Sequence, residues 1–137
     1  MLKGRAHRGL LLIAAFCALA PAAEKEISRE QARELVLKAL KAEGYPTNSP
    51  KFELHDRDDP YFPEFHSFSA YFDTPDRFAA IGHYAVNPKT ADVWEVMGCR
   101  RLKPRAIRAL QKSLRKESGL SKGDYKKYSS LAPCKRE

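Results

Sequence analysis

Side chains that could bind a metal are scattered over the middle of the chain. The candidate ligands are His55, His66 and His83, with acidic residues in the stretch 56–59. Zinc sites are usually marked by close pairs, such as two histidines one helical turn apart, and these residues show no such spacing. We therefore predict no metal site and no cofactor, and we interpret the histidines as polar residues of strands.

Acid–base or nucleophilic catalysis has equally weak support. Glu64, Asp73 and Glu95 could act as a carboxylate pair only if the fold brings two of them together, which spacing cannot show. The sequence contains no nucleophile elbow, phosphate-binding loop or dinucleotide fingerprint. Since no set of nucleophile and base stands out, we predict no catalytic residues and a protein that is not an enzyme.

The first 22 residues have the pattern of a secretory signal peptide. Three basic residues precede an apolar run at 9–20, which is shorter than the roughly 20 residues that span a bilayer. Ala20 and Ala22 are then placed as a cleavage site. We expect removal of residues 1–22, one domain over residues 23–137, no membrane span, and a periplasmic or secreted protein.

Cys99 and Cys134 remain in the predicted mature chain. In an oxidising compartment an even number of cysteines is read first as a disulfide. A thiol pair for metal or redox chemistry is the alternative, but the chain has no C-x-x-C motif. We predict a structural bridge.

The elements that must position these residues begin with a helix. Ser28 and Gln31 have the spacing of a capping box, and Gly44 ends the pattern. Four alternating or apolar segments follow and predict strands: KFELHD, HSFSAYF, FAAIGHYAV and VWEVM. A second helix is predicted in KPRAIRALQKSLRKESG, followed by a short helix or turn in LSKGDYKKY. This order predicts an α+β fold, in which an N-terminal and a C-terminal helix cover an antiparallel sheet of three to four strands, with one disulfide.

The first helix and the last hairpin resemble the PepSY family of small exported domains. The similarity covers 27–40 and 84–96, where Val86, Asn87, Thr90 and Val93 fall on the family's turn pattern and Ala91 replaces its usual glycine. The resemblance implies a PepSY-like core at about 27–97, with a basic helical extension at 100–137. It also implies a module that binds, and can inhibit, another protein such as a peptidase.

Two segments are candidates for binding. The loop DDPYFPEF offers Tyr61, Phe62 and Phe65, either as aromatic anchors on the surface or as rings folded back into the core. Trp94 is expected in the core, opposite the first helix. A basic stripe on the C-terminal helix is either an ordinary solvent-exposed face or a site for an anionic surface. We assign to it Arg101, Arg105, Arg108, Lys112 and Arg115.

Charge narrows the range of partners. The chain has a formal net charge of +8, and its basic excess lies after Cys99. No nucleic-acid-binding motif is present. Because we expect the protein outside the cytoplasm, we predict no nucleic-acid partner. We predict an exported, non-catalytic binding module that acts on an envelope or secreted protein. A periplasmic immunity protein that neutralises a toxin is the alternative, and an anionic-envelope-binding protein is a third hypothesis.

Overall fold

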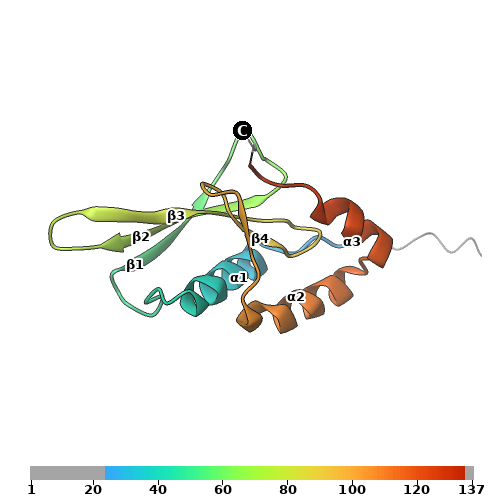
Figure 1. Ribbon diagram of the computed structural model, residues 1–137, viewed down its shortest axis with the longest axis horizontal. Coiled ribbons are helices and arrows are strands. Elements are labelled where there is room, and N and C mark those ends of the chain that lie inside the picture. The colour runs from blue at the N-terminus through green and yellow to red at the C-terminus, as the bar shows by residue number, and fades with distance from the viewer. Residues whose placement is uncertain (1–23, 135–137) are drawn as a thin grey trace, which may run out of the picture.

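The computed structural model describes residues 24–134, so the predicted signal peptide lies outside the described residues. The described chain forms three helices and one five-stranded antiparallel sheet (Figure 1). This confirms the predicted α+β fold class. The elements, in chain order, are α1 Arg29–Ala42, β1 Phe52–Arg57, β2 His66–Asp73, β3 Phe78–Val86, β4 Val93–Glu95, β5 Arg100–Leu102, α2 Arg105–Ser118 and α3 Lys122–Ser129.

Helix α1 begins with the predicted capping box. The backbone N–H of Gln31 donates to the hydroxyl of Ser28 over 3.1 Å, and the N–H of Ser28 donates to the side-chain oxygen of Gln31 over 2.8 Å. Two donors that the helix leaves unpaired are thereby satisfied. The apolar side of α1 is fully covered and consists of Ala32, Leu35, Val36, Ala39 and Leu40.

The sheet is a meander in the order β1-β2-β3-β4-β5. Its fifth strand, β5, pairs with β4 by placing Leu102 opposite Val93 and Arg101 opposite Trp94. The sequence pattern predicts at most four strands. A strand of three residues that begins with two arginines has too little alternation to be recognised.

Helices α1 and α2 lie side by side on one face of the sheet (Figure 1). Helix α2 follows Pro104 and ends at Gly119, whose φ of 72° requires the conformational freedom of glycine. Ile107 and Leu114 of α2 join α1 and the sheet in the main core. Phe68, Val86 and Val93 supply the sheet's side of that core.

A second apolar cluster lies on the opposite face of the sheet. Phe65, Ala85 and Trp94 form its centre, and both Cys99 and Cys134 pack against it. Trp94 is therefore buried as expected, with 5% exposure, but not opposite the first helix. Side chains alternate along a strand, and its neighbour Val93 already faces the helices.

The predicted disulfide is present and joins Cys99 to Cys134. It attaches the segment after α3 to the turn between β4 and β5. Among the helices of residues 24–134, none is long and apolar enough to cross a membrane.

Candidate functional site

The aromatic loop between β1 and β2 covers the second cluster, and its three rings have different roles. Phe65 is 5% exposed and belongs to that cluster. Tyr61 is 76% exposed, and Phe62 is half-buried. The backbone N–H of Tyr61 donates to the carboxylate of Asp59 over 2.9 Å, which fixes the loop's turn. The loop therefore folds one ring back into the core and leaves another on the surface, while the role of Tyr61 as a binding anchor stays a prediction.

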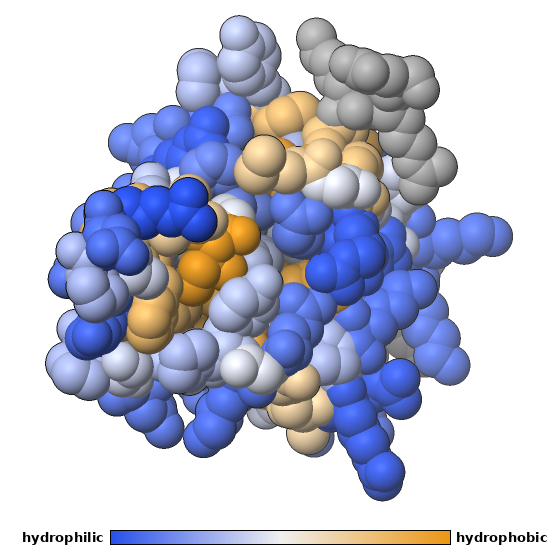
Figure 2. Space-filling view, turned by 60° about the vertical axis from the view of Figure 1, so that its left-hand side comes forward, coloured by the Kyte–Doolittle hydropathy of each residue, from blue (hydrophilic) through white to orange (hydrophobic). Residues whose placement is uncertain are grey.

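A shallow apolar hollow lies beside the exposed ring. Its volume is about 420 Å³, and its lining consists of Asp59, Tyr61, Phe62, Val96 and Cys134. We call these five residues the loop face. Figure 2 shows one side of the molecule, where apolar areas interrupt a mostly hydrophilic surface. Aromatic side chains at the rim of an apolar hollow are a common arrangement in protein-binding surfaces.

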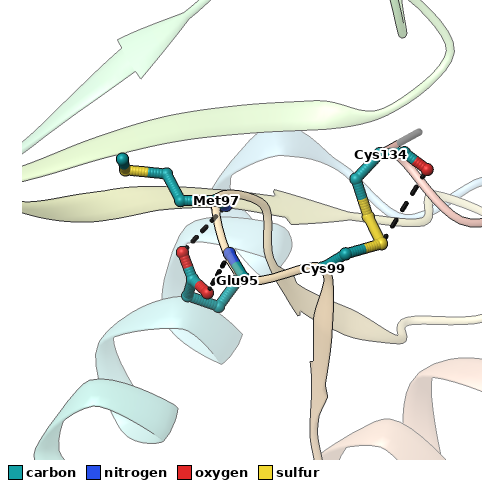
Figure 3. Close-up of a disulfide and its surroundings, with 5 residues drawn as sticks. Glu95, Met97, Cys99 and Cys134 are labelled. Carbon is teal, nitrogen blue, oxygen red and sulfur yellow. Dashed lines mark hydrogen bonds between the residues drawn. A yellow bond between two sulfur atoms is a disulfide. The ribbon is translucent and has the colours of Figure 1, made fainter. Parts of the chain in front are cut away.

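The turn after β4 adjoins the loop face, because its residue Val96 lines the hollow. The carboxylate of Glu95 accepts hydrogen bonds from the backbone N–H of Met97 over 2.9 Å and of Gly98 over 2.8 Å (Figure 3). A Cβ at Gly98 would lie 2.7 Å from the same carboxylate, so a larger residue there would displace the Glu95 side chain from these hydrogen bonds. Met97 is 76% exposed and points away from the disulfide. Glu95, a candidate for acid–base chemistry, thus organises a turn.

The other carboxylates of that candidate group are separated. Glu64 precedes β2, and Asp73 is the last residue of the same strand, eight residues long. A strand of this length separates its ends by roughly 25 Å. The structure therefore does not bring Glu64 and Asp73 together.

Each candidate histidine has a protein atom within hydrogen-bond distance of its ring. Nε2 of His66 lies 2.9 Å from the carbonyl oxygen of Ile27, Nδ1 of His83 lies 2.8 Å from the hydroxyl of Ser69, and His55 contacts the carboxylate of Glu53. Burial, with a smaller contribution from the nearby cation of Arg57, lowers the pKa of His83. Within residues 24–134, no three metal-ligating side chains lie together.

The predicted basic stripe divides into two groups. Arg101 lies in β5 and not on the helix, because α2 begins only after Pro104. Its guanidinium stacks on Trp94 at 4.8 Å from the ring centre and donates to the carbonyl oxygen of Ser129. The helix itself carries the other four predicted residues, Arg105, Arg108, Lys112 and Arg115.

A second hollow lies between β5, α2 and α3, and we call it the basic pocket. Its volume is about 270 Å³. It is lined by Asp92, Arg101, Leu102, Lys103, Arg108, Gln111, Arg115 and Tyr125. Arg105 and Lys112, also predicted for the stripe, do not line this pocket and lie exposed elsewhere on α2.

Asp92 and Tyr125 were not anticipated from the sequence. Asp92 is 3% exposed and accepts hydrogen bonds from Arg115 over 3.0 Å and from the hydroxyl of Thr90 over 2.8 Å. The ring of Tyr125 lies 4.4 Å from the same guanidinium. An acidic residue in a turn is usually solvated, so only the packing of α2 and α3 over the turn reveals its burial.

Comparison with known proteins places these surfaces in context. Neither protein-family models nor curated proteins match the chain. Among solved structures, the chain is similar to a chain of a type VI secretion system effector-immunity complex from Pseudomonas protegens, with a TM-score of 0.66 and 30% sequence identity. The alignment covers 82% of this chain and 95% of that chain. By this identity and coverage, the protein belongs to the same family as that chain.

Proposed function

We propose that this protein is an immunity protein, which neutralises a toxin by binding to it. The observation that carries the proposal is its 30% identity to a chain of an effector-immunity complex. This observation favours the sequence-based alternative over the peptidase-directed inhibitor. The PepSY resemblance itself remains a prediction, which the comparisons do not address.

The roles of the reactive side chains favour the immunity side of such a complex over the toxin side. Cys99 and Cys134 are joined in a disulfide, and Glu95 holds a turn. Nε2 of His66 contacts a backbone carbonyl oxygen. These side chains serve the fold, and a protein that acts by binding needs no catalytic set.

The loop face is the best-suited surface for the toxin. Tyr61 offers a large aromatic area at a small entropic cost, since its loop contains Pro60 and Pro63. Phe65, buried in the second cluster, fixes the base of that loop. An exposed aromatic ring on a fixed base is the typical anchor of a protein interface.

The protein is further proposed to act outside the cytoplasm. Two independent features support this location, namely the signal-like pattern of residues 1–22 and the disulfide. Structural disulfides persist in oxidising compartments such as the periplasm.

The test begins with the oxidised mature chain, residues 23–137, used to capture a partner from its own cells by crosslinking. The captured protein is then expressed in a bacterial host, with and without this protein exported to the periplasm. We expect growth to stop when the partner is expressed alone and to recover when both are present. A partner that is harmless, or one that is a peptidase without toxicity, would contradict the immunity role.

Tyr61→Ala tests the surface. Loss of an interface anchor typically costs about 2 kcal/mol, so we expect the dissociation constant of the toxin complex to rise roughly 30-fold. Tyr45→Ala is the matched control, because Tyr45 is a surface tyrosine that follows α1, outside the loop face. Equal effects of the two variants would show that the toxin binds elsewhere.

A further inference from the structure

We propose that the basic pocket binds a carboxylate side chain of an acidic segment on the protein partner. The proposal rests on the proposed function in one respect, namely that the partner is a protein. The pocket's preference for a carboxylate can be tested without that partner.

In the pocket, the side chain of Arg115 is held in place and its positive charge is already balanced. Nε of Arg115 donates to the carbonyl oxygen of Thr90 over 2.6 Å, and its Nη2 donates to Asp92 over 3.0 Å. The ring of Tyr125 covers the guanidinium. The buried carboxylate of Asp92 balances the charge of Arg115, so this pair gives the pocket its shape without contributing net charge.

The other basic side chains that line the pocket carry positive charge that other residues do not balance. Within the part of the chain that the structure describes, Lys103 and Arg108 make no ion pair with any carboxylate. Both are exposed at the mouth of the pocket. Arg101 contacts an aromatic ring and a carbonyl oxygen, neither of which carries a negative charge. Because the guanidinium of Arg101 lies against Trp94, on the other face of the sheet, the unbalanced cations at the hollow are Lys103 and Arg108.

The start of α2 increases this positive potential. Helices usually begin with a capping side chain and acidic residues, because the first turn carries a partial positive charge. Helix α2 begins at Arg105, and its N-cap residue Pro104 offers no capping side chain; the first turn contains no acidic residue. Lys103 and Arg105 stand there instead. Proteins tend to break local stability rules at functional or strained sites, and here the rule is broken next to Lys103, which lines the pocket.

The shape of the site selects among anions. A hollow of about 270 Å³ has room for one side chain or small anion, whereas a membrane surface would contact only its rim. A guanidinium binds a carboxylate through two parallel N–H donors, and Arg108 is the pocket arginine whose donors are not engaged by another described residue. The geometry therefore fits an aspartate or glutamate of a partner better than a lipid headgroup.

The experiment is an NMR titration of the oxidised mature chain, labelled with ¹⁵N. The probes are the blocked tetrapeptide acetyl-Gly-Glu-Asp-Gly-amide, its Gln/Asn counterpart, inorganic phosphate, and vesicles with and without phosphatidylglycerol. We expect saturable shifts at Lys103, Arg108 and Gln111 with the acidic peptide and none with its neutral counterpart. Stronger effects from phosphate or from anionic vesicles than from the peptide would overturn the proposal.

Two variants with identical charge change separate the pocket from general electrostatics. Arg108→Glu is expected to raise the peptide's dissociation constant at least tenfold. Lys51→Glu, before β1 at the opposite edge of the sheet from β5 and outside the pocket, is expected to change it less than about twofold at physiological salt, because the four strand spacings between the two edges exceed the screening length of about 8 Å. Both side chains are exposed, and unchanged NMR spectra elsewhere will confirm folding. Equal losses in the two variants would overturn the proposal.

Failure of this inference is distinguishable from failure of the immunity role. A toxin that is captured and neutralised, combined with no peptide binding at the pocket, would remove the carboxylate site and leave the proposed function intact. Specific peptide binding without any toxic partner would remove the immunity role and leave the carboxylate site intact.

Discussion

At the scale of single residues, Asp92 is the charged residue that the described part of the chain buries. It is buried in the turn between β3 and β4, where Arg115 supplies the compensating charge. An ion pair in such a position is replaceable as a unit, but either member left alone is costly.

Arg115→Met is therefore expected to lower the free energy of unfolding by about 3 kcal/mol, because Asp92 loses its counter-charge. The double variant Asp92→Asn with Arg115→Met should recover a large part of that loss. Urea unfolding measures both. Arg105→Met, an exposed site on the same helix, serves as control and should change stability by less than about 0.5 kcal/mol. A double variant no more stable than the single one would contradict this explanation.

His83 makes stability depend on pH in a defined direction. Burial lowers its pKa in the folded protein below the ordinary value of 6.5, so the unfolded chain takes up the proton more readily. The contribution of His83 to stability is therefore present above about pH 6.5 and decreases as the pH falls below it. His83→Gln removes this contribution.

The measurement compares urea unfolding of the wild type and His83→Gln at pH 7.5 and pH 5.5. We expect the wild type to lose more stability between these two values than the variant does. Parallel losses would show that His83 titrates normally in the folded state.

At the scale of elements, the disulfide holds the segment after α3 over the second cluster and keeps that cluster closed. The C-terminal segment is attached to the sheet by the Cys99–Cys134 bond, with a sequence separation of 35. Closing a loop of this length stabilises a folded domain by about 2–4 kcal/mol.

The variant Cys99→Ser with Cys134→Ser should lose about that amount. Trp94, the single tryptophan, reports on the same event because it lies in the cluster that the segment covers. Its fluorescence emission should shift to longer wavelength as water reaches the ring. Chemical reduction of the wild type should reproduce both changes. An unshifted emission spectrum would show that the loop alone protects Trp94.

The helices and long strands were predictable because each carries its own local signal. The capping box at Ser28, the stop at Gly119 and the alternation in β2 and β3 all lie within a few residues of the elements that they define. Strand β5 has no such signal, and its place in the sheet depends on pairing with β4. Even Ala91, where a glycine was expected, adopts the left-handed φ of 60° that the turn requires.

The candidate site was only partly predictable, because its geometry depends on contacts between distant segments. The sequence identified Tyr61, Phe62 and Phe65 together but could not tell the exposed ring from the buried one. Helical spacing grouped Arg105 with Arg108, whereas in the folded chain Arg108 lines the pocket and Arg105 does not. Such distinctions are set by tertiary structure.

At the scale of the whole molecule, the prediction to test is export through the signal peptide. Expression of the full chain in a bacterial host should yield periplasmic protein that begins at Ala23 and contains one disulfide. Mass spectrometry under non-reducing conditions measures both. Replacing the small residue at the cleavage site, by Ala22→Leu, should cause uncleaved precursor to accumulate. Recovery of the complete chain from the cytoplasm would contradict the signal peptide.

The position of the sheet between two separate apolar clusters has a consequence for evolution. The main core holds the helices, while Phe65, Ala85 and Trp94 hold the loop on the other side. Substitutions in the loop can accumulate without repacking the helices, so recognition can diverge while the chain continues to fold. A protein family whose binding partners change during evolution would benefit from this independence. We therefore expect related sequences to vary most at the loop.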